Sequence, residues 1–203
     1  MAAMTNGPME FGAAMLTLPG ETESGDRYVV KHRTSGVLVA VVDGLGHGSE
    51  AAAAAKVALS VLETYVDEPV ITLLNRCHES LRRTRGVVMS LASFDFPHDE
   101  MTWLGVGNVE GLLLRGDKVP PVEHLILRPG VAGSQLPPLR ATVVPLQQND
   151  TLIFFTDGIR SDFTEKTLDL GLPVQVIADR ILARHTKGTD DALVLVGRYR
   201  KGL

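Results

Sequence analysis

The sequence predicts an α+β fold in which mainly antiparallel strands form a sandwich. Two observations carry this prediction. Apolar and β-branched runs bounded by turn residues fill most of the chain, and three segments with helical spacing are unevenly placed among them. The order is a hairpin, two helices, a run of strands, a helix and a final strand. It therefore differs from the regular strand–helix alternation of a doubly wound parallel sheet.

The first predicted elements are a hairpin and a helix. Residues 26–33 and 37–42 are rich in β-branched residues and are separated by Thr-Ser-Gly, which indicates a β-hairpin. Apolar residues then recur at helical spacing from Ala53 to Val66, and Gly48 or Ser49 stands where a helix cap is expected. The small alanines of this helix predict close packing on a sheet.

A second helix is predicted after Pro69. Its apolar positions run from Ile71 to Leu81, and three arginines follow within residues 82–85, where the helix dipole favours cations. We interpret this basic run as a solvated helix end, with docking of an acidic partner as the alternative. Cys77 is interpreted as a core residue, since no motif around it would activate a nucleophile. His78 is interpreted as a packed or partly exposed helix residue rather than a ligand.

The rest of the chain returns to strand periodicity. Residues 87–95, 101–108 and 109–115 are predicted to form consecutive antiparallel strands, joined by turns near Pro97 and Gly107-Asn108. In this interpretation Asn108 closes a hairpin, with a role in a site as the alternative. The remaining predicted elements are strands at 122–128, 139–146, 151–156 and 192–199 and a helix at 173–185.

Length and composition limit the class of protein. The chain has 203 residues, of which 44% are hydrophobic and 22% charged, so we expect one domain over residues 1–203. A net charge of −4 argues against a nucleic-acid partner. No apolar run approaches the roughly 20 residues of a transmembrane helix, and no signal-peptide pattern opens the chain. The single cysteine excludes an internal disulfide and fits an intracellular protein, so we expect a cytoplasmic location without membrane association. We also expect a monomer.

The most informative feature is an acidic turn after an apolar strand. Residues 37–48 read Val-Leu-Val-Ala-Val-Val-Asp-Gly-Leu-Gly-His-Gly, so that Asp43 follows a buried strand and glycines free the backbone after it. The same construction recurs at Asp157-Gly158, and the pair Asp190-Asp191 directly precedes the last strand. A single Asp-Gly is typical of a tight turn. Three such acidic positions at strand ends favour one site, and oxygen ligands of this kind suit Mg²⁺ or Mn²⁺.

Five short motifs occur in the order found in metal-dependent serine/threonine protein phosphatases of the PPM type. They are Ser24-Gly25-Asp26, Val42-Asp43-Gly44-Leu45-Gly46-His47-Gly48, Gly105-Val106-Gly107-Asn108, Thr156-Asp157-Gly158 and Asp190-Asp191-Ala192-Leu193. The chain resembles this family over nearly its whole length. Within the family it is most similar to the bacterial partner-switching branch, and there to the compact feedback phosphatases of the stressosome.

The resemblance implies a four-layer αββα sandwich of two mainly antiparallel sheets flanked by helices, with two Mn²⁺ or Mg²⁺ ions at one edge. Asp43 would bridge both ions and the carbonyl of Gly44 would bind one of them, while Asp157 and Asp190 would bind the other. In this family pattern Asp43, Asp157 and Asp190 are the catalytic carboxylates.

Two further carboxylates belong to the implied centre. Asp26 would hold metal-bound waters rather than an ion directly. Asp191 stands where many relatives have Asn, so it is counted with the metal site but ranked below Asp190.

The implied reaction is hydrolysis of phosphoserine or phosphothreonine by a hydroxide that bridges two metals, without a phosphoenzyme. The implied substrates are phosphorylated STAS-domain regulators of a bacterial stress-signalling pathway, the stressosome. Three alternatives remain open at this point: a phosphatase of an anti-anti-sigma factor, a phosphatase of a small metabolite, and a non-catalytic regulator with this fold. A catalytic domain cut from a larger sensor protein would show the same motifs.

Two positions depart from the wider family. Eukaryotic members place a histidine directly after the Asp-Gly, whereas Leu45 stands there in this chain and the histidine follows as His47. For His47, a structural or helix-capping role competes with a role as proton donor. No arginine precedes Asp26, so the cation that would grip the phosphate is not identified from the sequence.

Overall fold

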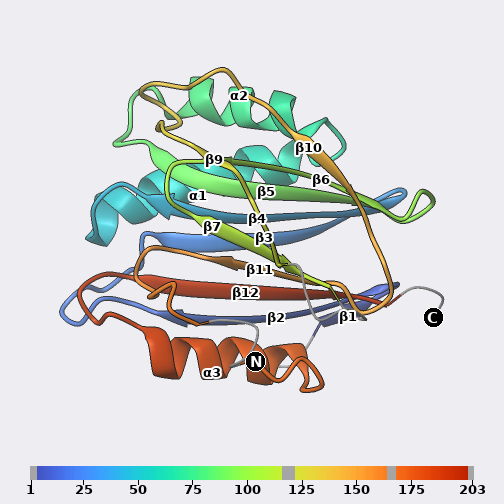
Figure 1. Ribbon diagram of the computed structural model, residues 1–203. Coiled ribbons are helices and arrows are strands. Elements are labelled where there is room, and N and C mark those ends of the chain that lie inside the picture. The colour runs from blue at the N-terminus through green and yellow to red at the C-terminus, as the bar shows by residue number, and fades with distance from the viewer. Residues whose placement is uncertain (1–3, 116–121, 164–167, 201–203) are drawn as a thin grey trace.

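The computed structural model describes residues 4–115, 122–163 and 168–200, and shows two stacked β-sheets with helices on both outer faces (Figure 1). In spatial order, sheet A contains β1 (Met4–Asn6), β2 (Met9–Leu16), β12 (Ala192–Tyr199), β11 (Thr151–Phe155), β7 (Glu110–Leu114) and β8 (Val122–His124). Sheet B contains β10 (Thr142–Pro145), β6 (Glu100–Val106), β5 (Val87–Asp95), β4 (Gly36–Gly44) and β3 (Asp26–Arg33), with β9 (Leu127–Arg128) parallel to β6.

The helices complete four layers. Helices α1 (Gly48–Thr64) and α2 (Val70–Leu81) cover the outer face of sheet B, and α3 (Val174–His185) covers the outer face of sheet A (Figure 1). The predicted αββα sandwich is therefore confirmed. No helix in the described ranges is long and apolar enough to cross a membrane.

Strand β4 shows why its sequence is apolar at every position from Val37 to Val42. Val39 and Val41 pack in the layer between the two sheets, whereas Leu38 and Ala40 pack in the layer beneath α1 and α2. All four side chains are at most 1% exposed. Because both faces of the sheet are covered, the strand loses the alternation of a half-exposed strand and reads as one continuous apolar run.

Helix α1 packs closely on sheet B because its contacting residues are small. Ala54, Ala55 and Ala58 are fully buried against the sheet, as their size predicts. A Cβ on Gly44 would lie 2.2 Å from the carbonyl oxygen of Ala51. Glycine at that position is therefore required by the approach of the helix, in addition to any role in the turn.

The start of α1 differs from the prediction. The helix begins at Gly48, and His47 occupies the cap position without a side-chain hydrogen bond to the helix. Neither Gly48 nor Ser49 is the cap. Gly48, where the helix begins, has a φ of +74°, a left-handed conformation that glycine adopts without strain.

The predicted run of consecutive antiparallel strands is correct for β5 and β6 but wrong for β7. Strands β5 and β6 pair in sheet B, whereas β7 pairs with β11 in sheet A. The chain changes sheets at Gly107, whose φ is +93° and whose Cβ would lie 2.1 Å from the side chain of Val88. This crossing places the next residue, Asn108, at the edge shared by both sheets.

Other boundaries also changed. The predicted strand 122–128 is two short strands in different sheets, β8 and β9, and the predicted strand 139–146 is limited to β10. Strands β1 and β2 were not predicted. The segment Met9–Leu16 contains Gly12, Ala13 and Ala14, which have little strand propensity, and it is held in place by pairing along β12.

Gly12 supplies a test of this packing. A Cβ at Gly12 would lie 2.5 Å from backbone atoms of Gln175 in the first turn of α3. We expect Gly12→Ala to lower the free energy of unfolding by about 1–3 kcal/mol, because α3 must move away from sheet A. Gly171→Ala is the control, since the added Cβ would contact only the Asp169 carboxylate at 3.2 Å. Urea titration measures both, and equal stability of the two variants would contradict the close contact.

Candidate metal centre

The ends of strands from both sheets bring carboxylates to one edge of the sandwich. In sheet B, Asp26 opens β3 and is the direct partner of Asp43 near the end of β4. In sheet A, Asp157 lies two residues beyond β11 and Asp190 two residues before β12, and these strands are antiparallel neighbours. Residues separated by more than a hundred positions in the sequence therefore meet at this edge.

Three of the predicted ligands line one open cleft. Asp43, Asp157 and Asp190 all contribute to its walls. The other lining residues come from three loops and the start of β5: Leu45, Gly46, Val88, Gly107, Asn108, Pro129 and Val131. Glycines at the rim leave main chain exposed beside the carboxylates, which suits the approach of a phosphate group.

Asp26 is held rigidly behind the cleft. Its side chain is 1% exposed, and Oδ2 accepts a hydrogen bond of 2.7 Å from the Thr156 hydroxyl. The same hydroxyl oxygen accepts a 2.9 Å bond from the backbone N–H of Leu193. The sequence interpretation did not single out Thr156, although its place directly before Asp157 made it a candidate. It fixes the orientation of Asp26 across the two sheets.

Asp191 has contacts that differ from those of Asp190. Its Oδ1 accepts a 2.8 Å bond from the backbone N–H of Leu18, and its Oδ2 accepts a 2.7 Å bond from that of Gly25. The side chain is buried and does not line the cleft. These bonds give Asp191 a positioning role and favour the ranking of Asp190 above it as a ligand.

Asn108 does not close a hairpin, because β6 and β7 lie in different sheets, and its contacts favour the alternative of a role in the site. Its side-chain amide donates a 2.8 Å hydrogen bond to Oδ2 of Asp157. A turn signal in the sequence could not reveal this contact, because it depends on β7 crossing to the other sheet. The occurrence of Gly107-Asn108 in the family motif was the available signal.

His47 lies outside the cleft lining. Its Nδ1 is 2.5 Å from Oε1 of Glu21, and its side chain is 59% exposed. The structure therefore places His47 in an exposed contact with Glu21 beside the turn. Cys77 is buried, and burial raises the pKa of its thiol to about 12, in agreement with its interpretation as a core residue.

The glycine after Asp157 is required by close packing. A Cβ on Gly158 would lie 1.9 Å from the carbonyl oxygen of Asp191. The Asp157-Gly158 turn is thus pressed against the segment that carries Asp190 and Asp191. Because Gly158 has no side chain, its backbone can contact the backbone of Asp191 directly. This contact holds the two acidic segments together.

The carboxylates raise one another's pKa. Burial, and then repulsion by Asp26, Asp157, Asp190 and Asp191, raises the pKa of Asp43 to about 9. Burial is also the main cause that raises the pKa of Asp26 to about 7, against the hydrogen bond from Thr156. The pKa of Asp157 is raised by burial and by Asp190. The edge is therefore short of positive charge, and bound cations would relieve the repulsion.

The donor set fits ions that keep much of their water. In the described ranges, no three Asp, Glu, His or Cys side chains are already gathered as ligands of one ion. The carboxylates instead stand on different walls of the cleft. Mg²⁺ is commonly bound by one or two carboxylates and several waters, so this spacing suits hard cations better than a tight cage of protein ligands.

The pKa shifts predict that the metal-free protein loses stability as pH rises. Asp26 and Asp43 bind protons more tightly in the folded state, with pKa values of about 7 and about 9 against 3.8 for the ordinary side chain. The stability conferred by their protonated forms is complete below the unfolded pKa and is lost as pH rises through the folded values. We expect the thermal midpoint in EDTA to fall from about pH 6 to about pH 9, and Mn²⁺ to restore it.

Substitution of Asp by Asn separates the ionisation of the cleft carboxylates from the titration of other groups in the protein. Asp43→Asn removes one ionisation and is expected to raise the free energy of unfolding of the metal-free protein by roughly 1 kcal/mol at about pH 8. Asp67→Asn, at a side chain 71% exposed, is the control and leaves the pH dependence unchanged. A midpoint that rises with pH in EDTA would contradict the crowding of carboxylates.

Comparison with known proteins identifies the family. The family described as Stage II sporulation protein E (SpoIIE) matches residues 33–200. The phosphoserine phosphatase RsbX of Bacillus subtilis is 25% identical over 185 residues, which cover 90% of this chain and 91% of that protein.

Two solved structures share the whole fold. One, described as "The bacterial stressosome: a modular system that has been adapted to control secondary messenger signaling", has a TM-score of 0.87 and 28% identity, and the match covers 94% of this chain and 99% of that one. RsbX in complex with magnesium has a TM-score of 0.88 and 22% identity, with 98% of both chains covered. The predicted resemblance is confirmed: the chain belongs to the SpoIIE family of PP2C-type phosphatase domains.

Proposed function

We propose that this phosphatase hydrolyses phosphoserine or phosphothreonine on STAS-domain regulators of a bacterial stress-signalling pathway. The observation that carries the proposal is the convergence of Asp43, Asp157 and Asp190 from both sheets in one open cleft. An open cleft admits a side chain that projects from a protein surface. The similarity to a phosphoserine phosphatase, and to a structure from work on the stressosome, supports this class of substrate.

The proposed cofactors are two Mg²⁺ or Mn²⁺ ions. Asp43 and the Gly44 carbonyl would hold ions on the side of sheet B, and Asp157 and Asp190 on the side of sheet A. When bound, two such cations neutralise charge on the phosphoryl group and lower the pKa of a water that attacks phosphorus. A phosphoserine carries between about one and two negative charges near neutral pH, so the carboxylates alone would repel it.

The remaining site residues position the ligands. Thr156 orients Asp26 through the 2.7 Å hydrogen bond, and Asn108 orients Asp157 through the 2.8 Å bond. Asp191 anchors its own segment to the backbone of Leu18 and Gly25. We place Asp26 behind the metals, where its carboxylate would accept hydrogen bonds from water. This arrangement fixes the carboxylates before any ion binds and limits the reorganisation needed for catalysis.

Carboxylate substitutions test the proposed centre. Asp43→Asn and Asp157→Asn are each expected to lower the metal-dependent rate of aryl phosphate hydrolysis by at least about a hundredfold, because the ions lose a charged ligand. Asp67→Asn is the control: it makes the same exchange at an exposed side chain that does not line the cleft, and it keeps the wild-type rate. Circular dichroism checks that the variants are folded. Activity retained in both cleft variants would disprove the assignment.

Substrate preference tests the proposed class. With Mn²⁺ present, we expect the protein to dephosphorylate a phosphorylated STAS domain and to leave sugar and nucleotide phosphates largely intact. EDTA stops the reaction because the ions are needed to attract the phosphate. Preference for a small metabolite phosphate would contradict the proposed substrate. Absence of turnover on every phosphorylated compound would indicate a non-catalytic regulator.

A further inference from the structure

We propose that a basic surface beside the cleft docks an acidic segment of the phosphorylated protein substrate. This basic surface consists of Arg160, Arg180, Arg184 and Lys187, all of which are exposed. The inference rests on the proposed function, and it adds a charge preference for the residues around the phosphorylated side chain.

The basic surface is fixed to the metal centre by backbone hydrogen bonds. Ile159 and Thr186 form an isolated antiparallel bridge. On either side of it, the N–H of Arg160 donates a 2.8 Å bond to the carbonyl of His185, and the N–H of Lys187 donates a 2.8 Å bond to the carbonyl of Gly158. Residues 158–160 directly follow Asp157, so the cations are held next to a proposed metal ligand.

Lys187 lies beside the centre, because its backbone is hydrogen-bonded to Gly158, the residue after Asp157. The Arg160 side chain turns toward α3, where Nη2 donates a 2.7 Å bond to the carbonyl oxygen of Arg184. The end of α3 and the segment after Asp157 therefore form one connected basic edge.

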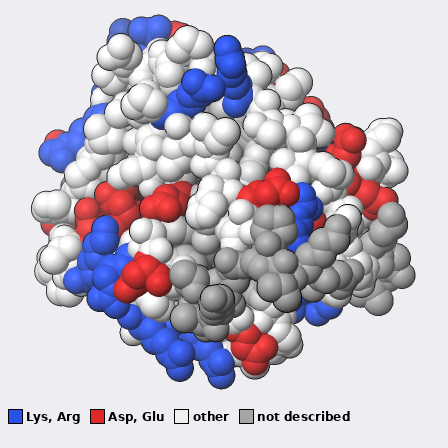
Figure 2. All heavy atoms as spheres, in the orientation of Figure 1, with Lys and Arg blue, Asp and Glu red and all other residues white. Residues whose placement is uncertain are grey.

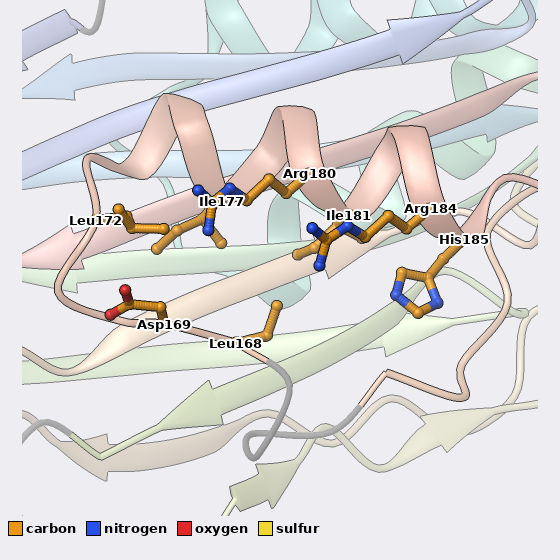
Figure 3. A pocket seen from close by; sticks show the side chains of 8 residues that line it. All are labelled: Leu168, Asp169, Leu172, Ile177, Arg180, Ile181, Arg184 and His185. Atoms are coloured by element: carbon orange, nitrogen blue, oxygen red, sulfur yellow. The ribbon is translucent and has the colours of Figure 1, made fainter.

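Arg180 and Arg184 extend this edge along α3. They are four residues apart and project from the same side of the helix, with their guanidinium groups toward the segment that carries Leu168 and Asp169 (Figure 3). Asp169 accepts a hydrogen bond from the backbone N–H of Gly171. Two like charges at this spacing destabilise a helix slightly. Arg184 lies in the last turn of α3, where the helix dipole favours a cation, so the pair is tolerated on this exposed surface.

Among the described residues, few carboxylates pair with this surface. Within the described ranges, no ion pair joins Arg180, Arg184 or Lys187 to a carboxylate, and the Asp162 carboxylate that lies 3.6 Å from Arg160 also accepts from His185. Figure 2 shows Lys and Arg side chains gathered on the lower left of the molecule, over α3. The chain as a whole carries a net charge of −4, so this concentration of positive charge is local.

An acidic protein segment fits this arrangement. A small phosphate compound would bind in the cleft alone and would not reach the cations along α3. A polypeptide with a phosphorylated residue in the cleft extends beyond it, and carboxylates on that extension would meet the basic surface. Such complementary charges increase the rate of encounter and select among partners.

Two matched double variants test the docking surface. Arg180→Gln with Arg184→Gln removes two positive charges from the basic surface, and Lys31→Gln with Arg140→Gln removes two from exposed positions elsewhere. Three probes are compared with Mn²⁺ present: p-nitrophenyl phosphate, a phosphoserine peptide flanked by Asp and Glu, and the same peptide with Asn and Gln. We expect kcat/KM on the acidic peptide to fall about fivefold in the first variant only, mainly through KM.

The remaining measurements decide the outcome. The proposal requires unchanged hydrolysis of p-nitrophenyl phosphate and the neutral peptide, and a weaker salt dependence on the acidic peptide in the Arg180/Arg184 variant. Equal rates of wild type on the two peptides, or equal losses on both peptides in that variant, would overturn the docking surface while leaving the phosphatase function intact. Inactivity of the wild type on every phosphorylated probe would overturn both.

Discussion

The hydrogen bonds that join the two sheets at their acidic edge are the contacts on which the site depends. The Thr156 hydroxyl of sheet A donates to Asp26 of sheet B, and Asp191 of sheet A accepts from the backbone of Gly25. Both carboxylates are buried, so each bond also satisfies a group that would be costly to leave unpaired. Without these links the two sheets would still share an apolar layer, but the acids would have no fixed positions across it.

The same edge opposes its own folding electrostatically. Burial and mutual repulsion raise the pKa of Asp26 and Asp43, and no lysine or arginine is among the described residues that line the cleft. The apolar layers on both faces of β4 and β12 hold the strand ends in place despite this repulsion. Stability is thus supplied by the sandwich, while the edge is left suited to divalent cations. A site of this kind sacrifices some stability for function.

The sequence predicted those parts of the fold that depend on local pattern. The unbroken apolar run before Asp43 indicated a strand with both faces buried, and the alanines of α1 indicated close packing. Strand β2 could not be predicted, because Gly12, Ala13 and Ala14 become a strand only through pairing with β12. The acids at strand ends were recognised, whereas Thr156 and Asn108 were not assigned to the site. Their roles follow from contacts between the sheets, and Asn108 reaches Asp157 only because the chain crosses at Gly107.

The pairing of β2 with β12 also limits the order in which the strands can pair during synthesis of the chain. These strands are separated by about 180 residues of sequence and lie side by side from end to end. Contacts of such long range form slowly, and during synthesis the edge of β2 that faces away from β1 stays unpaired until β12 leaves the ribosome. Asp190 and Asp191 precede β12 directly, so the acidic edge is assembled in the last step. A nascent chain would remain inactive until then, and the open edge of β2 would be the segment most exposed to misassociation.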